Sequence, residues 1–247
     1  MNSGLYGACA GLMARTQALD TIAANVANSS SAGFRGEADI FGTVLAEAGR
    51  HGNMSALNKA TNSFTQIAGT QLDTTQGVIA RTGNDLDVAI EGQGYFKVQS
   101  AKGTVYTRNG HFHADATGRL VTDAGDPVIG DAGEIRLAKG KVAISANGTI
   151  SCDGVVSAKL SLVTFAPGTK LVNHGQAQYG APAGSEMPAS QISLQQGALE
   201  GSNVSPMEGV VQLITAQRAA ESMRHALTLI DGEMDRSTVQ DLAKVNQ

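Results

Sequence analysis

Charged residues are scarce in this sequence, and their scarcity limits the partners it can bind. Asp, Glu, Lys and Arg make up 16% of the 247 residues, against about 25% in an average soluble domain. There is no long basic run, and the formal net charge is -4 at pH 7. Neither a nucleic-acid backbone nor an anionic membrane is therefore an expected partner. A surface with so few charges is instead available for contacts with other proteins.

Cysteines and long apolar runs are also scarce. Cys9 and Cys152 form no CxxC pair and have no histidine close in sequence, so neither a redox pair nor a zinc site is indicated, and both thiols are expected to be buried. No run of 18 or more apolar residues occurs, which argues against membrane insertion. The N-terminus lacks the basic region and apolar stretch of a signal peptide. If the protein leaves the cytoplasm, we expect another route.

Motifs for catalysis or cofactor binding are missing as well. Gly92 opens "GQGYFK", but the third glycine of a dinucleotide fingerprint is absent and a strand is predicted where a helix should start. His111 and His113 share one face of a predicted strand, without a third metal ligand at a suitable spacing. Asp85 and Asp87 also share a face and are expected at a solvated edge. We therefore predict no enzyme activity, no cofactor and no metal ion.

Apolar residues recur at helical spacing at both ends of the chain. The N-terminal seam spans residues 3–28 and consists of Leu5, Leu12, Leu19, Ile22 and Val26. The C-terminal seam consists of Leu213, Ala220, Met223, Leu227 and Ile230. Such seams are typical of amphipathic helices that pair, although each helix could instead pack against a globular core.

The start of the C-terminal helix is marked by "SPME". Ser205 can cap the first free N–H groups, and Pro206 suits the first helical position because it has no N–H to lose. Glu208 can reach back to the Ser205 amide. The helix is therefore predicted to begin at residue 205.

The middle of the chain has the pattern of β structure. Between about residues 77 and 166, short apolar runs such as "LDVAI", "YFKV" and "LSLVTF" are separated by Asn-Gly, Asp-Gly and Thr-Gly pairs, which are typical of hairpins. The predicted fold class is α+β, with paired terminal helices that form a coiled-coil-like axial domain and a central all-β domain. The predicted segments are an axial helix over 1–36, an extended connection over 37–76, the β domain over 77–185, a return connection over 186–204 and an axial helix over 205–247.

Four blocks of sequence resemble the signature blocks of the bacterial flagellar rod and hook proteins, in the same order. They are "ALDTIAANVANSSSAGF" (18–34), "GNDLDVAIEGQGYFKV" (83–98), "YTRNGHFHADATGRLVTDAGDPVIG" (106–130) and "GALEGSNVSPMEGVVQLITAQRA" (197–219). The compact length, "YTRNG" and "GSNVSP" are most similar to the proximal rod members of that family. Distal rod and hook-type subunits are the alternative within the family. Another extracellular fibre protein or a β-rich hydrolase are alternatives from different classes.

The resemblance implies a mechanical role. Terminal helices would pack in the core of an axial tube with the β domain outside, so that the assembled rod transmits torque from motor to hook. Implied partners are copies of the chain itself, other flagellar rod proteins and the flagellar export apparatus. The resemblance also implies export without a cleaved signal peptide and a location in the rod of the basal body, in the periplasmic space.

The resemblance also points to motif residues outside the two seams. The N-terminal motif falls on Asn25, Asn28, Gly33 and Phe34, and the C-terminal motif falls on Gly201, Asn203, Val204 and Pro206. Ala24 and Ser30 stand where the family usually has asparagine. These residues and the seams form the predicted assembly interface. An asparagine on a packed helix can bond across to a neighbouring subunit and fix its register, which is the hypothesis for Asn25 and Asn28.

Overall fold

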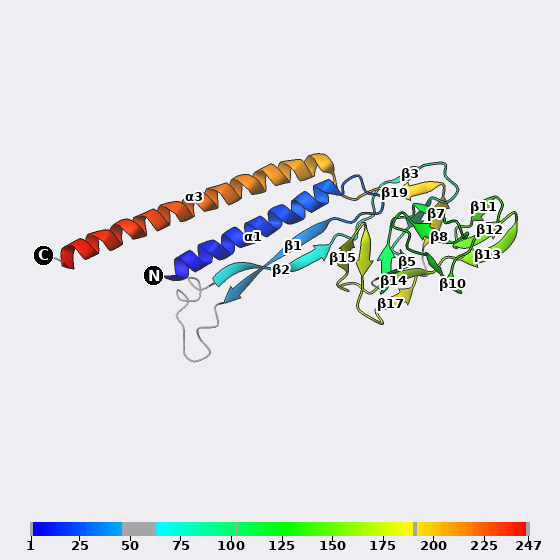
Figure 1. Cartoon of the computed structure of the whole chain (residues 1–247), viewed down its shortest axis with the longest axis horizontal. Helices are drawn as coiled ribbons and strands as arrows, with labels where there is room; N and C mark the ends of the chain where they lie inside the picture. The colour runs from blue at the N-terminus through cyan, green and yellow to red at the C-terminus, as the bar shows by residue number, and fades with distance from the viewer. Residues whose placement is uncertain (1, 46–62, 102, 190–191, 246–247) are drawn as a thin grey trace. The chain divides into compact units, whose positions relative to one another are not determined.

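The computed structural model describes residues 2–45, 63–101, 103–189 and 192–245 (Figure 1). The chain divides into two compact units. Unit 1 comprises Met1–Val26, Glu37–Thr70 and Pro206–Gln247, and unit 2 comprises Ala27–Gly36 and Gln71–Ser205.

Unit 1 consists of two long helices and a two-stranded sheet (Figure 1). Helix α1 (Asn2–Ala27) ends where Asn28 and three serines follow, because these side chains favour turns over helix interiors. Helix α3 (Pro206–Val245) begins with proline and carries Glu208 in its first turn, where a carboxylate interacts favourably with the helix dipole. Strands β1 (Glu37–Leu45) and β2 (Ser63–Leu72) pair with each other. Neither helix contains, in its described residues, an apolar stretch long enough to cross a membrane.

Unit 2 is built from short antiparallel strands. A six-stranded sheet has, in spatial order, the strands β15 (Val172–Gly175), β16 (Gln178–Gly180), β6 (Gly103–Thr107), β5 (Tyr95–Ser100), β14 (Leu162–Phe165) and β17 (Glu186–Pro188). A three-stranded sheet consists of β11 (Val142–Ile144), β12 (Thr149–Cys152) and β13 (Val155–Lys159). The remaining two-stranded pairs are β7 (Phe112–Ala114) with β8 (Leu120–Thr122), β9 (Ile129–Gly130) with β10 (Gly133–Glu134), β18 (Ser193–Gln196) with β4 (Val88–Glu91), and β19 (Ala198–Glu200) with β3 (Ile79–Arg81).

The apolar core of unit 2 has two parts. The larger cluster combines residues of seven short strands with residues between strands and consists of Val88, Ile90, Phe96, Phe112, Leu120, Val128, Ile135, Ile144, Ile150, Leu160 and Leu194. The smaller cluster consists of Tyr95, Tyr106, Val163 and Tyr179. Each fully buried large side chain contributes about 1.5–3 kcal/mol relative to exposure, so unit 2 has a core of its own.

The α+β class is confirmed, whereas the coiled-coil character of the helices stays a prediction. Strands β17, β18 and β19 occupy the segment predicted as a return connection, because their pairing with distant strands leaves no local pattern. Asp153-Gly154 does turn between two strands, with φ of 50° and 82°. Asn109-Gly110 was expected to form a hairpin turn, but it links strands of different sheets. A Cβ at Gly110 would lie 1.7 Å from the Val88 carbonyl oxygen, so this glycine permits close backbone approach.

Candidate assembly site

The contact between α1 and α3 is centred on small residues. A Cβ added at Gly11 would lie 3.0 Å from Met223 Cε, and one added at Gly209 would lie 2.5 Å from Val26 Cγ2. Because Gly11 of α1 meets Met223 in the middle of α3, while Val26 near the end of α1 meets Gly209 in the first turn of α3, the two helices run antiparallel (Figure 1). Ala14 is also buried in α1. The glycines form holes that admit the larger side chains of the other helix.

Two of the predicted seam residues, Val26 and Met223, take part in this contact. Ala220 is buried, and the other seam residues with described side chains are half-buried, namely Leu12, Leu19, Ile22, Val26, Leu213, Met223 and Leu227. The side chains of Leu5 and Ile230 lie outside the described residues. The sequence analysis relied on large apolar residues and therefore missed Gly11, Ala14 and Gly209.

A second apolar stripe on α3 is exposed to solvent. Met207 is 83% exposed, Val211 64% and Ile214 47%, and Val210 joins them at the same helical spacing. Val211 stands two residues from both Gly209 and Leu213, which places it about 200° around the helix from the contact with α1. The first two turns of α3 thus carry apolar residues on two opposite faces, and α1 covers one of them.

Asn25 binds the start of β1. Its Oδ1 accepts the Glu37 N–H at 3.0 Å and its Nδ2 donates to the Glu37 carbonyl at 2.7 Å. One turn earlier, the Thr21 hydroxyl donates to Asp39 at 3.0 Å. A side-chain amide matches both polar groups of one backbone residue, which alanine or lysine cannot do. These two bonds of Asn25 lie within the chain, and the bond to another subunit that the sequence analysis expected stays a prediction.

The segment after α1 turns back onto unit 2. Its first turn is closed by the Ser31 N–H, which donates to the Asn28 carbonyl at 3.0 Å. Gly33 has φ of +66° and donates its N–H to the Glu200 carbonyl at 2.7 Å. A Cβ there would lie 2.2 Å from the Asn109 nitrogen, so both conformation and space require glycine. Phe34 follows and is 3% exposed.

Asn203 joins three segments of unit 2. Its Oδ1 accepts the Gly36 N–H at 2.8 Å, while its Nδ2 donates to the carbonyls of Asp73 and Thr75, each at 3.1 Å. Its own N–H donates to the Phe34 carbonyl at 3.3 Å. The N-terminal and C-terminal motifs are therefore hydrogen-bonded to each other inside one chain.

Two neighbouring motif residues, Gly201 and Val204, are held through their backbone N–H groups. Gly201 donates its N–H to the Val78 carbonyl at 2.9 Å. Val204 donates its N–H to the Ser202 hydroxyl at 3.1 Å. Pro206 is exposed at the first position of α3. The first two contacts hold the segment that follows β19 within unit 2.

A buried cluster of three charges lies beside these motifs. Glu200 Oε1 is 2.7 Å from Arg35 Nη2, and Glu200 Oε2 is 2.8 Å from Arg108 Nη1. The side chains are 1–3% exposed. Arg108 also donates to the carbonyl of Gly92 and stacks over the ring of Tyr95, 5.4 Å from its centroid. We call Arg35, Glu200 and Arg108 the charge cluster.

Burial dominates the electrostatics of this cluster. It lowers the pKa of Arg35, against the opposing effect of Glu200, and Arg108 lowers that pKa further. Burial also raises the pKa of Tyr95. Two guanidinium groups and one carboxylate carry a net positive charge, so loss of the carboxylate would leave two cations buried without compensation.

The sequence analysis missed the charge cluster, although a signal for it exists. Each member lies within two residues of a glycine, in "GFRG", "TRNG" and "LEG", and Arg108 and Glu200 lie inside quoted blocks. Because the chain has few charges, charged residues this close to glycines are a pattern that could have drawn attention to them. Their mutual contact still could not be predicted, because three distant segments supply them.

The structure corrects one expectation about the acidic residues and one about the cysteines. Asp87 is 2% exposed, and accepts from Thr82 at 2.5 Å and Asn84 at 2.9 Å, with His111 Nδ1 at 2.7 Å. Asp87 therefore holds three neighbouring side chains in place by hydrogen bonds, while Asp85 is exposed. Cys152 is buried as expected, but Cys9 is exposed. Among the described residues, no three His, Cys, Asp or Glu side chains are grouped to hold a metal ion.

Comparisons with known protein families agree with this arrangement. Residues 5–35 match the family described as "Flagella basal body rod protein", residues 89–158 match "Flagellar hook protein FlgE/F/G D1 domain", and residues 195–231 match "Flagellar basal body rod FlgEFG protein C-terminal". The first and last matches contain the two motifs that Asn203 joins. The fold and site therefore define an axial structural protein of the bacterial flagellum.

Whole-chain relatives make the assignment narrower. "Flagellar basal-body rod protein FlgF" of Caulobacter vibrioides is 33% identical over 250 residues, covering 100% of both chains. FlgF of Salmonella typhimurium is 32% identical, covering 87% of this chain and 88% of its own. "Flagellar basal-body rod protein FlgG" of Bacillus subtilis is 30% identical, covering 94% and 96%. The chain belongs to the flagellar basal-body rod protein family and is a structural subunit of the rod. The fibre-protein and hydrolase alternatives are therefore set aside.

Proposed function

We propose that this chain is a proximal rod subunit that assembles through its terminal helices into the drive shaft between motor and hook. Relatives named FlgF at 32–33% identity support the proximal position. The distal rod remains the alternative, since relatives named FlgG are 30–31% identical. The role is mechanical, and partners are copies of the chain, other rod proteins and, during export, the flagellar export apparatus.

The exposed stripe on α3 is the observation that carries this proposal. Met207, Val210, Val211 and Ile214 are exposed although each could be buried, and burial of a side chain of this kind stabilises a contact by about 1.5–3 kcal/mol. A contact between this stripe and a different surface of the next copy would be heterologous. Such a contact extends into a helical array when it does not close into a ring.

Substitutions in the exposed stripe of α3 and in the two seams test the proposal. Val211→Asp places a charge in the exposed stripe, so we expect normal helix content in the monomer, while cells that carry it lack complete rods and do not swim. Leu19→Asp and Leu227→Asp place the charge between α1 and α3, so the monomer itself should lose helical circular dichroism. The β-type signal and thermal transition of unit 2 should stay in all three.

The matched control is Thr215→Asp, which adds the same charge to an exposed position of α3 beside the stripe. It should leave rods and swimming near normal. Complete rods in the Val211→Asp strain would refute assembly through this stripe.

A further inference from the structure

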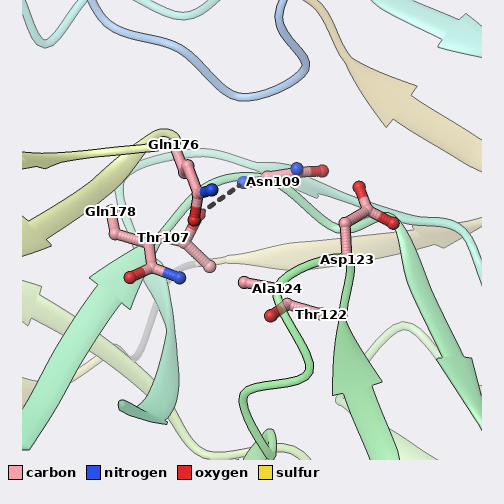
Figure 2. Close-up of a pocket in the computed structure, with 7 residues that line it drawn as sticks. All are labelled: Thr107, Asn109, Thr122, Asp123, Ala124, Gln176 and Gln178. Atoms are coloured by element: carbon pink, nitrogen blue, oxygen red, sulfur yellow. Dashed lines mark hydrogen bonds between the residues drawn. The ribbon is translucent and has the colours of Figure 1, made fainter. Parts of the chain in front are cut away.

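Unit 2 contains a polar pocket of about 190 Å³ (Figure 2). The residues that line it, among them Thr107, Asp123 and Gln178, present oxygen and nitrogen atoms, and none of these described residues carries sulfur. Sulfur is the element of protein side chains that small oxidants attack most readily. The side chains that are open to oxidation therefore lie outside this pocket.

Four methionines have side chains that the structure describes, and they differ widely in exposure. Met207 in the first turn of α3 is 83% exposed, Met13 on α1 is 73% exposed and Met187 on β17 is 41% exposed. Met223 is half-buried and lies over Gly11 of α1. Because an oxidant must reach the sulfur atom, we expect Met207 to react faster than Met223.

Met207 differs from the other exposed methionines in its neighbours. It is the first residue of the exposed stripe on α3, one turn before Val210 and Val211, which are 44% and 64% exposed. Met187 instead lies on an edge strand of the six-stranded sheet in unit 2. A chemical change at Met207 therefore alters the surface through which, under the proposed function, the chain binds its next copy.

A hydroperoxide converts methionine into methionine sulfoxide. The sulfur lone pair attacks a peroxide oxygen, the S–O bond forms while the O–O bond breaks, and hydrogen peroxide leaves as water after a proton shift. The sulfur is oxidised and the peroxide is reduced, so no further reactant is needed. The product is a polar side chain. In the monomer the sulfoxide of Met207 would keep its water, since this side chain is 83% exposed, and α3 should stay folded.

We propose that Met207 is an oxidation site that controls assembly, because its sulfoxide prevents the stripe from binding the next copy. The inference rests on the proposed function of the stripe. Burial of the thioether is favourable, whereas burial of the sulfoxide removes water from a polar group without supplying a partner. The contact should weaken at least about tenfold. A dithiol, through a methionine sulfoxide reductase, reverses the change by taking the oxygen as water and becoming a disulfide.

Treatment of the purified full chain with hydrogen peroxide, followed by peptide mass spectrometry, tests the site. Met207 should gain oxygen several-fold faster than Met223, without loss of helical circular dichroism. In purified basal bodies Met207 should react more slowly than in the monomer, because the stripe is covered there. Equal rates at Met207 and Met223 in the monomer, or equal rates at Met207 in monomer and basal bodies, would overturn the proposal.

Variants in cells test the effect on assembly. Met207→Gln imitates the length and polarity of the sulfoxide, so cells that carry it should form few complete rods. Met187→Gln makes the same change at an exposed methionine of unit 2 and should leave the number of rods near normal. Leucine has no sulfur, so a Met207→Leu strain exposed to peroxide should lose a smaller fraction of its new rods than the original strain, each relative to its own untreated culture. Equal fractional losses would contradict the proposal.

The Val211→Asp strain separates this inference from the proposed function. Rods that are blocked by Val211→Asp but complete with Met207→Gln would mean that the stripe assembles the rod and that Met207 does not control it. Complete rods with both variants would mean that the stripe is not the assembly contact, and both proposals would then fail. Rods blocked by both variants, but not by Met187→Gln, are the expected result.

Discussion

Oε1 of Glu200 lies 2.7 Å from Nη2 of Arg35, and each side chain is 1% exposed. Arg35 follows the N-terminal helix, whereas Glu200 precedes the C-terminal helix. The ion pair therefore fixes, inside unit 2, the two points where the chain enters and leaves the helices. Arg108 at 2.8 Å from the same carboxylate connects both points to the β core.

We predict that Glu200→Gln destabilises unit 2 by about 3–5 kcal/mol, because two buried guanidinium groups lose their common anion. At roughly 2–4 °C per kcal/mol for a domain of this size, the melting temperature should fall by about 10 °C. Thermal unfolding followed by β-type circular dichroism measures this change.

The control for that prediction is Glu134→Gln. Glu134 lies 3.8 Å from Arg119 and is 43% exposed, so its removal should change stability by less than about 1 kcal/mol. Equal stability of the Glu200→Gln chain and the original chain would show that the charge cluster does not hold the motifs.

Gly33→Ala should destabilise unit 2 more than Gly83→Ala. Both glycines have positive φ, +66° and +78°, but a Cβ at Gly33 would lie 2.2 Å from the Asn109 nitrogen, whereas one at Gly83 has no atom within 4 Å. The Gly83 variant measures the conformational cost alone, about 1–2 kcal/mol. We expect an additional loss of at least about 2 kcal/mol at Gly33 from the clash, measured by urea unfolding. Equal losses would mean that the backbone shifts freely there.

The sequence predicted the positions of the two helices of unit 1 better than it predicted which of their residues make contacts. Seven-residue spacing located both helices, because amphipathic periodicity is a local property. It did not predict that Gly11 and Gly209 would form the contact, because the spacing of apolar residues does not show which side chain of one helix packs against which glycine of the other. It also did not predict the exposed stripe at Val211, because valine on a helix is expected to be buried.

Polar interactions were the least predictable part. Asn25 and Asn203 could be identified as motif residues, yet they bond to backbone groups of Glu37 and Gly36. A sequence does not show which backbone groups will lie within reach of a given side chain. The charge cluster and the Asp87–His111 pair likewise join segments far apart in the chain. Only the fold brings them together.

Paired deletions test where the β core begins. Residues 27–36 cluster with unit 2, so deletion of residues 1–26 should leave the thermal transition of unit 2 nearly unchanged. Deletion of residues 1–36 removes Arg35 and the buried Phe34, and should lower the transition by roughly 10 °C or abolish it. If both deletions behave alike, the boundary lies after residue 36, as the helix pattern predicted.

The stability of unit 2 should respond to acid through Glu186. Lys97 Nζ lies 2.7 Å from Oε2 of Glu186, and the Tyr106 hydroxyl donates to Oε1 of the same carboxylate. The hydrogen bond from Lys97 is the main cause that lowers the pKa of Glu186, followed by the bond from Tyr106. A carboxyl whose pKa is lowered in the folded state stabilises the folded state above the unfolded pKa of about 4.3, and this contribution is lost as the pH falls through the lower folded value.

Lys97→Met should therefore cost about 0.5 kcal/mol near pH 7, with the difference from the original chain shrinking below about pH 4. Urea unfolding at several pH values measures it, with Lys159→Met as control, since that cation lies 3.5 Å from Asp131 in an exposed pair. A Lys97 effect that is constant down to the lowest pH would mean that lysine packing, rather than its charge on Glu186, supplies the stability.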